Sequence, residues 1–348
     1  MALEPTITNI SNDGDNTTFT LSDVNVSYAN AVRRTIIADI PTVVFITTPH
    51  DKNKAIFISN TTQLHNEILK QRLSCIPIHI DGSSDIRNNL KNYLVEVDVE
   101  NTTDTAMYVT TKDFKIKDLT TGEYVDDNVS REIFPSYIPP TGNGEYYIDF
   151  VRLAPKVSAE LSGGKLHMTC EMSVACARDN SMFNVTGTCA YGCTPDPNKI
   201  SKQLEIQKQK WKDENKTSPE IIFEEANWKL LEGMRHVVDN SFDFTIQTVG
   251  VYENAYIIEQ ACNIVISKLM ELDGTIDDDS IIITPSNNIV ENCYDITLVN
   301  ENYTIGNMLN YEVYALFYSE MRLVDFVGYN KAHPHDADSI LKISLTDK

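Results

Sequence analysis

Apolar residues recur at helical spacing in four segments of the chain, and we predict a helix in each. The segments are residues 24–40, 60–72, 255–272 and 305–317. The first and last helices each present one apolar face that must pack on another element. The residues on these two faces are Ala29, Val32, Ile36, Ile305, Leu309, Val313 and Leu316.

Local signals predict where these helices begin and end. Pro41 ends the first helix, because the residue before a proline is pushed out of the helical region. Short polar side chains precede three of the helices and can cap them. The candidate caps are Asp23 or Asn25, Asn60 or Thr61, and Asn302 or Thr304.

Alternation of apolar and polar residues predicts strands at both ends of the chain and a β-rich middle. The predicted strands are 17–21, 42–47, 55–59, 94–99, 107–111, 146–153, 165–175, 242–250, 295–299, 324–329 and 339–345. The lysine-rich segment 201–215 is predicted to be a solvated helix or a mobile excursion. Near each end, a strand is followed by an amphipathic helix and another strand. We therefore expect an α+β fold in which the two end units pack on each other as an intramolecular pseudo-dimer.

Charge excludes one large class of functions. The chain has 348 residues, with 29 Lys and Arg against 50 Asp and Glu, so its net charge is −21. Proteins that neutralise phosphates need clustered cations, so we expect no direct DNA or RNA contact and no docking on anionic membranes. The length suggests about two domains, and 42% hydrophobic residues indicate a folded protein.

The sequence also indicates the cellular compartment of the protein. No apolar run reaches the ~20 residues that span a bilayer, and residues 1–22 lack the features of a signal peptide. The seven cysteines are odd in number and scattered, which favours a reducing compartment over a disulfide framework. We expect a cytoplasmic protein.

Three motifs in the first part of the chain resemble the α-type subunits of cellular RNA polymerases. These subunits are bacterial α, archaeal D and the third-largest subunit of the eukaryotic enzyme. The motifs are Asn30-Ala-Val-Arg-Arg-Thr-Ile-Ile-Ala-Asp-Ile-Pro41, residues 60–67 with Arg72-Leu-Ser-Cys-Ile-Pro-Ile78, and Ser241-Phe-Asp-Phe-Thr-Ile-Gln-Thr-Val-Gly250. Their order along the chain matches that of the family.

The last part of the chain resembles a different subunit, the eleventh-largest, or archaeal L. The motifs are Asn302-Tyr-Thr-Ile-Gly-Asn-Met-Leu309, Phe326-Val-Gly-Tyr329 and His333-Pro334. The chain therefore resembles two α-like subunits fused into one polypeptide. Such fusions imply a large cytoplasmic DNA virus, with the protein in viral factories and packaged in the virion.

The resemblance implies a domain organisation. Residues 1–47 and 176–272 would form the third-subunit-like dimerisation domain, and 48–175 an inserted β-rich domain. Residues 273–281, with Gly274 and three consecutive aspartates, would be the linker, and 282–348 the eleventh-subunit-like domain. A covalent linker raises the effective concentration of the two partners.

The sequence departs from the family at several points. Residues 81–90 contain no cysteine, so the zinc loop of the third subunit is absent, as is the cysteine run of an iron–sulfur cluster. The long helix that usually ends the eleventh subunit does not follow the last strand. We expect that another polymerase subunit or an unrecognised helix covers the apolar face of helix 255–272.

The function that the resemblance implies is a non-catalytic assembly scaffold. It would bind the second-largest and largest polymerase subunits and small zinc-binding subunits, and would carry no cofactor and no catalytic residues. No nucleophilic triad, phosphate loop or paired carboxylates are evident. The acidic surface would lie away from the DNA channel. One alternative is a standalone regulatory or storage-type binding module that reuses α-like domains; another is an unrecognised acidic hydrolase.

Four cysteines offer a possible metal site. Cys170, Cys176, Cys189 and Cys193 are spaced C-x5-C-x12-C-x3-C, looser than the paired spacing of most structural zinc sites, so buried hydrophobic roles are preferred. His333 and His335 are better explained by a turn, and Asp277–Asp279 by a solvated linker than by a magnesium triad.

Arg33 and Arg34 are the candidate residues for binding a large subunit. Consecutive helical residues point about 100° apart, so at most one of them faces the apolar seam. The alternatives are a solvated face or an internal salt bridge. We favour the interface, because arginine suits fixed bidentate pairing.

Overall fold

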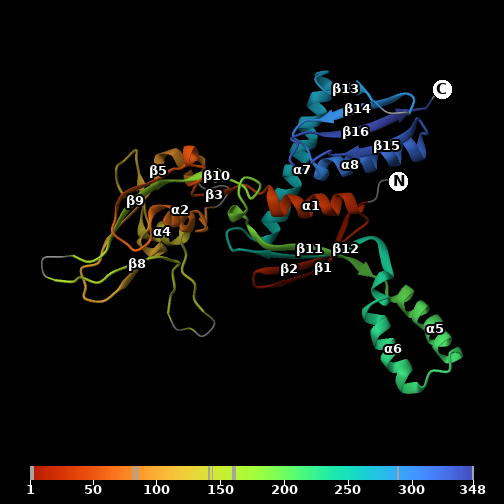
Figure 1. Ribbon diagram of the computed structural model, residues 1–348, viewed down its shortest axis with the longest axis horizontal. Helices are drawn as coiled ribbons and strands as arrows, with labels where there is room; N and C mark the ends of the chain where they lie inside the picture. Colours follow the sequence, from red (N-terminus) through yellow and green to blue (C-terminus); the bar gives the residue numbers. More distant parts are fainter. Residues whose placement is uncertain are drawn as a thin grey trace. The chain divides into compact units, whose positions relative to one another are not determined.

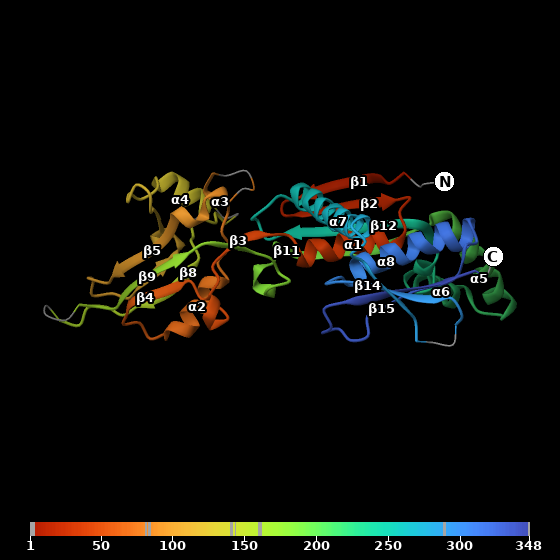
Figure 2. The same cartoon turned by 90° about the horizontal axis from the view of Figure 1, so that it is seen from above.

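The computed structural model describes residues 4–80, 82, 85–139, 142, 144–158, 162–287 and 290–346. Its contacts divide the chain into two compact units. The first consists of residues 1–36, 186–247 and 254–348, and the second of residues 37–185 and 248–253. Figure 1 shows the elements, and Figure 2 shows them from above.

The first unit contains a sheet whose strands come from distant parts of the sequence. Its order is β1-β2-β12-β11, formed by Thr6–Asp13, Asn16–Ser22, Val237–Thr248 and Thr186–Pro195. The polar strand β1 was not predicted, because none of its side chains is buried and it therefore lacks alternation. Phe19 of β2 and Phe244 of β12 are paired in register and stack at 5.1 Å between ring centroids. Helices α1 (Val26–Ala38) and α7 (Asn254–Asp277) lie beside this sheet (Figures 1 and 2).

A second sheet of the first unit is built from the C-terminal part of the chain. Its order is β13-β14-β16-β15, formed by Ile282–Pro285, Cys293–Leu298, Ser339–Leu345 and Val324–Asn330. Helix α8 (Tyr303–Val313) runs along it and continues into a π-helical segment, Tyr314–Glu320. The predicted helix 305–317 is thus confirmed in place, but its last part has the wider π-helical turn.

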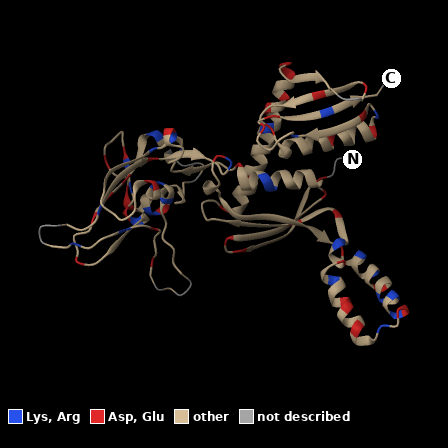
Figure 3. Ribbon diagram, viewed as in Figure 1, with Lys and Arg blue, Asp and Glu red and all other residues tan. Residues whose placement is uncertain are grey.

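A helical hairpin links β11 to β12 within this unit. It consists of α5 (Pro197–Asp213) and α6 (Ser218–Leu230). The segment predicted as a solvated helix or mobile excursion is therefore an ordered helix with a partner that the sequence did not reveal. Figure 3 shows positive charge along α5, which carries Lys199, Lys202, Lys208, Lys210 and Lys212.

The second unit is β-rich, as predicted for the middle of the chain. Its main sheet has the order β4-β9-β5-β7, formed by Ala55–Asn60, Lys165–Glu171, Tyr93–Glu100 and Lys115–Asp118. Two short sheets pair β6 (Met107–Thr110) with β8 (Asp149–Leu153), and β10 (Ser173–Ala175) with β3 (Thr42–Val44). The predicted strand 165–175 is therefore two strands in two sheets.

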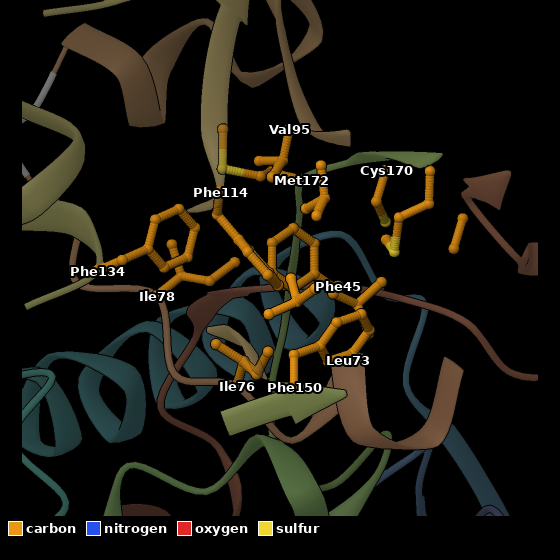
Figure 4. Close-up of a cluster of buried hydrophobic side chains, with 14 of the residues drawn as sticks. Phe45, Leu73, Ile76, Ile78, Val95, Phe114, Phe134, Phe150, Cys170 and Met172 are labelled. Atoms are coloured by element: carbon orange, nitrogen blue, oxygen red, sulfur yellow. The ribbon is translucent and has the colours of Figure 1, made fainter. Parts of the chain in front are cut away.

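Helices α2 (Asn66–Ser74), α3 (Asp85–Asn88) and α4 (Asp127–Ile133) complete the second unit. Single 3-10 turns lie at His50–Lys52, Leu90–Asn92, Thr111–Asp113 and Ser181–Phe183 here, and at Gly233–Arg235 in the first unit. Four phenylalanines lie in an otherwise aliphatic core (Figure 4). The ring of Phe114 lies 5.4 Å from that of Phe134 and 5.5 Å from that of Phe150, both edge to face.

Two predicted boundaries are wrong for identifiable reasons. Helix α2 begins at Asn66, because Asn60 does not cap it: its Oδ1 accepts the backbone N–H of Thr62, which forms a turn. Helix α7 continues through Gly274 to Asp277. A single glycine costs a helix only about 1 kcal/mol, so the non-helical part of the predicted linker 273–281 is short.

Candidate subunit interface

Helix α1 begins where the sequence predicts a cap. The Oδ1 atom of Asn25 accepts the backbone N–H of Ser27 at 2.9 Å, while Asp23 has a φ of +60° just outside the helix. Four side chains of α1 are buried: Ala29, Ala31, Thr35 and Ile36. They do not form a single stripe, which indicates that the helix packs on more than one side.

Helix α8 also has a predicted cap, since the Oδ1 atom of Asn302 accepts the backbone N–H of Thr304 at 2.8 Å. Its glycine has a packing role. A Cβ atom at Gly306 would lie 1.9 Å from Cε2 of Tyr329 on β15. The two motifs of the last part of the chain therefore meet, because the tyrosine ring occupies the space that a side chain at Gly306 would need.

A small apolar cluster joins α1, α7 and α8. Its buried members are Ala31, Val265, Ile305 and Met308, and the partly buried Tyr28, Leu269 and Leu309 pack against them. Ala31 is small, which allows the helices to approach closely. Full burial of a side chain such as Ile305 contributes about 1.5–3 kcal/mol, so this cluster is a main source of the attachment of α8 to α1.

Two polar contacts accompany this cluster. The Nε atom of Arg34 donates a hydrogen bond of 3.1 Å to Oγ1 of Thr304 at the start of α8. The hydroxyl of Tyr28 donates one of 2.5 Å to Glu312 near its end. Burial and the neighbouring Glu312 carboxylate raise the pKa of Tyr28 above its ordinary value, so the phenol stays protonated and keeps donating.

The predicted dimerisation residues are only partly brought together. Ile305 and Leu309 belong to the cluster with α1. On α1 itself, the cluster uses Tyr28 and Ala31, which lie on the adjacent face. The other predicted residues are placed as follows: Ala29 and Ile36 are buried, Val32 and Val313 are half-buried, and Leu316 is 39% exposed in the π-helical segment.

The face of α1 that meets α8 could have been predicted from the spacing of Tyr28, Ala31 and Thr35. These residues are three and four apart and mark one side of a helix. The predicted face instead carried the larger side chains of Val32 and Ile36. Met308 and the close approach of Tyr329 to Gly306 were not predicted either.

The two candidate arginines have different surroundings. Arg33 Nε and Nη2 both donate to Oδ1 of Asn30, one turn earlier on α1. Its positive charge also lies close enough to Cys189 to oppose the rise in that thiol's pKa. Arg34, by contrast, contacts α8. As the 100° spacing requires, one arginine of the pair faces the helix seam and the other does not.

The four cysteines are placed in two different units. Cys170 lies in the apolar core of the second unit, and Cys176 belongs to the same unit but not to that core. Cys189 and Cys193 are on β11 of the first unit. Burial raises the pKa of both Cys170 and Cys189 to about 12, so each is a protonated thiol at neutral pH. Among the described residues, no group of three or more His, Cys, Asp or Glu side chains is placed to hold a metal ion.

The histidine pair His333 and His335, the other candidate metal site, is explained by a local turn. The backbone N–H of His335 donates to Nδ1 of His333, and that of His333 donates to Asp336, so these residues form the predicted turn.

In the described part of the chain, no helix combines the length and apolar character that crossing a membrane requires.

The Arg72–Ile78 motif contributes core side chains and hydrogen bonds to the second unit. Leu73, Ile76 and Ile78 are buried in its core. The Oγ of Ser74 donates to the backbone carbonyl of Phe45, and an Nη2 hydrogen of Arg72 bonds the carbonyl of Asp149. These residues anchor α2 and the extended segment after it, and are therefore structural.

The chain matches a known family over most of its length. Residues 18–269 match the model of the RNA polymerase Rpb3/Rpb11 dimerisation domain. The chain is also 38% identical over 64 residues to the DNA-directed RNA polymerase subunit Rpo3 of Pyrococcus horikoshii. That match covers 18% of this chain and 22% of the relative, so the chain spans about a fifth of the length of this relative.

The matched range includes the first sheet from β2 onwards, α1, the whole second unit and most of α7. Helix α1 and the α1 and α7 members of the cluster lie in the matched range, whereas Ile305, Met308 and Leu309 of α8 lie beyond it. The chain belongs to the RNA polymerase Rpb3/Rpb11 dimerisation domain family.

Proposed function

We propose that the chain is an assembly subunit of a DNA-directed RNA polymerase, and that it carries both halves of an α-type dimer in one polypeptide. The observation that carries the proposal is the packing of α1 on α8 through Ala31, Ile305 and Met308, within a family defined by a dimerisation domain. In an α-type dimer the two helices would belong to separate chains. Here residues on either side of the same seam are about 270 positions apart in one chain.

The two halves share a simple plan. Each has an antiparallel sheet and a helix that contributes to the shared cluster: α1 with the first sheet, and α8 with the second. Helix α7 adds Val265 and Leu269 to the same cluster. A covalent connection between them removes much of the entropy cost of association. This supports an intramolecular pseudo-dimer, and with it the proposed fusion of third-subunit-like and eleventh-subunit-like domains.

The proposed partners are the second-largest and largest polymerase subunits and small zinc-binding subunits. Arg33 is the better of the two arginines for this contact, because Arg34 is engaged with Thr304 inside the unit. The catalytic magnesium would be held by the largest subunit, so the chain itself would be non-catalytic. The net charge of −21 suits a surface that faces away from template DNA.

The origin in a large cytoplasmic DNA virus, with packaging in the virion, is part of the same proposal. It rests on the resemblance to a fused pair of subunits. A standalone binding module is less well supported, because the matched family is one of polymerase subunits.

The test is affinity purification of the tagged full chain from the cells that produce it. We expect two much larger polypeptides in equimolar amounts and RNA synthesis on added DNA. An Arg33→Ala variant should recover less of the large subunits while keeping its circular dichroism spectrum. Recovery of the chain alone, or with small proteins and no RNA synthesis, would contradict the proposal.

A further inference from the structure

Helix α6 in the first unit exposes the apolar side that an amphipathic helix usually buries. None of its thirteen residues is buried. Pro219, Phe223, Ala226 and Leu230 are three or four positions apart, so they follow one side of the helix. Phe223 is 67% and Leu230 is 75% exposed, and Ile222 beside them is 69% exposed. These five residues form what we call the outer face of α6.

The opposite side of α6 is charged, and it is the side that meets α5. The Glu225 carboxylate lies 2.7 Å from Nζ of Lys208 on α5. At about 100° per residue, Glu225 is about 140–160° around the helix from Leu230 and Phe223. The contact with α5 therefore uses the charged side of α6, and the apolar outer face takes no part in holding the hairpin together.

The shape of the outer face fits a polypeptide better than a small molecule. The hairpin projects from the end of the first sheet (Figure 1). From Pro219 to Leu230 the apolar positions extend over about 16 Å at 1.5 Å per residue. Small-molecule sites are concave, whereas this face is the ridge of a single helix. An exposed apolar ridge that includes an aromatic ring is typical of a protein contact.

The charged residues on either side of the outer face are already paired within the hairpin. Glu220 accepts hydrogen bonds from the backbone N–H and the hydroxyl of Thr217. Nζ of Lys229 lies 2.7 Å from the Glu225 carboxylate. The outer face therefore offers no unpaired charge to a partner, even though the chain as a whole carries −21. Complementarity then requires apolar side chains with uncharged flanks, because a charge buried here would find no counter-ion.

We propose that the outer face of α6 binds an amphipathic helix of another protein, one with uncharged residues beside its apolar side. That apolar side would pack on Phe223 and Leu230, and the small Ala226 between them would let the two helices approach closely. This contact concerns the hairpin alone, so it does not depend on the polymerase assignment.

Two other occupants are less well matched. A second copy of this chain would bring together two molecules that each carry a net charge of −21. Helices that lie on a membrane surface carry free Lys or Arg beside their apolar side, whereas the lysine beside this face, Lys229, is paired with Glu225.

The test uses the full chain and two fluorescent synthetic helical peptides. The first has a leucine face with glutamine and alanine elsewhere, and the second has serines in place of the leucines. We expect saturable binding of the first by fluorescence anisotropy, and at least about tenfold weaker binding of the second. The affinity for the first should not fall between about 0.05 M and 0.5 M salt, because an apolar contact is not screened.

A pair of substitutions locates the site. The double variant Phe223→Ser, Leu230→Ser should bind the leucine peptide at least about tenfold more weakly. Ile56→Ser, Ile58→Ser is the matched control, because these two residues are similarly exposed on β4 of the second unit; its binding should be unchanged. Circular dichroism and unchanged tryptophan emission from the hairpin establish that the first variant keeps its fold.

Five results would overturn the proposal. They are no saturable binding of the leucine peptide, equal loss in both double variants, weaker binding at the higher salt concentration, a dimer of the free chain in sedimentation that Phe223→Ser, Leu230→Ser separates, or binding to phosphatidylcholine–phosphatidylserine vesicles that the same variant loses. Failure here would leave co-purification with large polymerase subunits unaffected, so the two proposals are tested separately.

Discussion

The side chain of Arg34 donates a hydrogen bond of 3.1 Å from Nε to Oγ1 of Thr304. The two residues lie 270 positions apart, and Thr304 is 3% exposed. Arg34 comes from the N-terminal helix, and Thr304 is at the start of the helix in the C-terminal sheet unit. This bond and the apolar cluster beside it join the two ends of the chain.

A double-mutant cycle measures this bond. Arg34→Ala and Thr304→Val should each lower the free energy of unfolding, and the double variant should lose less than the sum of the two. We expect a coupling of about 0.5–1.5 kcal/mol, typical of a hydrogen bond. Arg33→Ala combined with Thr304→Val is the control and should be additive, because Arg33 bonds Asn30 instead. Additivity in both cycles would contradict the contact.

The glycine of α8 is expected to tolerate no side chain. Gly306→Ala should destabilise the chain by about 1–3 kcal/mol, because its Cβ would overlap the ring of Tyr329. The measurement is urea unfolding followed by circular dichroism. Gly274→Ala is the control: a Cβ there meets nothing within 4 Å, so this change should be neutral or stabilising.

The partner residue provides a second check. In a Tyr329→Ala background the ring is gone, so Gly306→Ala should cost less than in the native chain. An unchanged cost would mean that something other than the ring penalises the alanine.

The α5–α6 hairpin can be followed by its own fluorescence. The chain has two tryptophans, Trp211 on α5 and Trp228 on α6. The hydroxyl and the backbone N–H of Thr217 both bond Glu220 in a capping box. Thr217→Ala should therefore lower the stability of the hairpin by about 1 kcal/mol.

The measurement is the midpoint of the tryptophan fluorescence transition in urea, compared with that of circular dichroism. Ser201→Ala on α5 is the control, because the hydroxyl of Ser201 donates only to the carbonyl of Pro197 within α5 and takes no part in the capping box. A fluorescence midpoint that does not move in Thr217→Ala would show that the capping box does not stabilise the hairpin.

Acid should weaken the second unit through Glu96. The hydroxyl of Tyr124 and Nε2 of His167 bond this carboxylate, and these bonds hold its pKa below the ordinary value. A group whose pKa is lower in the folded state stabilises the fold above its unfolded pKa of roughly 4.3. That contribution is lost as the pH falls through the folded pKa.

Glu96→Gln should therefore lower the melting temperature at pH 7 more than at roughly pH 3.5. Glu123→Gln is a suitable control, because that side chain is exposed and takes no part in the cluster. An equal loss at both pH values in Glu96→Gln would show that the carboxylate charge does not contribute.

Much of the fold follows from local signals in the sequence. The caps at Asn25 and Asn302, the apolar face of α8, the strands after it and the β-rich middle are all where the pattern predicts them. These features depend on neighbours in sequence, which explains why they could be predicted. Strand β1 and helix α6 could not, because neither has a buried side chain to mark its inner face.

The seam between α1 and α8 was predicted less well, for a physical reason. Helix α1 is covered on more than one side, so its apolar residues do not identify the face that meets α8. Ala31 makes that contact because it is small, whereas the sequence favours large residues such as Val32 and Ile36. Similarly, no local pattern reveals that the ring of Tyr329 sits over Gly306.

The central claim is that the N-terminal and C-terminal parts of one chain form a single helix-paired unit. Its most direct test is a protease site inserted in the short connection between α7 and β13, at residues 278–281, followed by cleavage and size-exclusion chromatography. The account predicts that the two fragments co-elute, and that Ile305→Asp separates them. Elution of the native C-terminal fragment by itself after cleavage would contradict it.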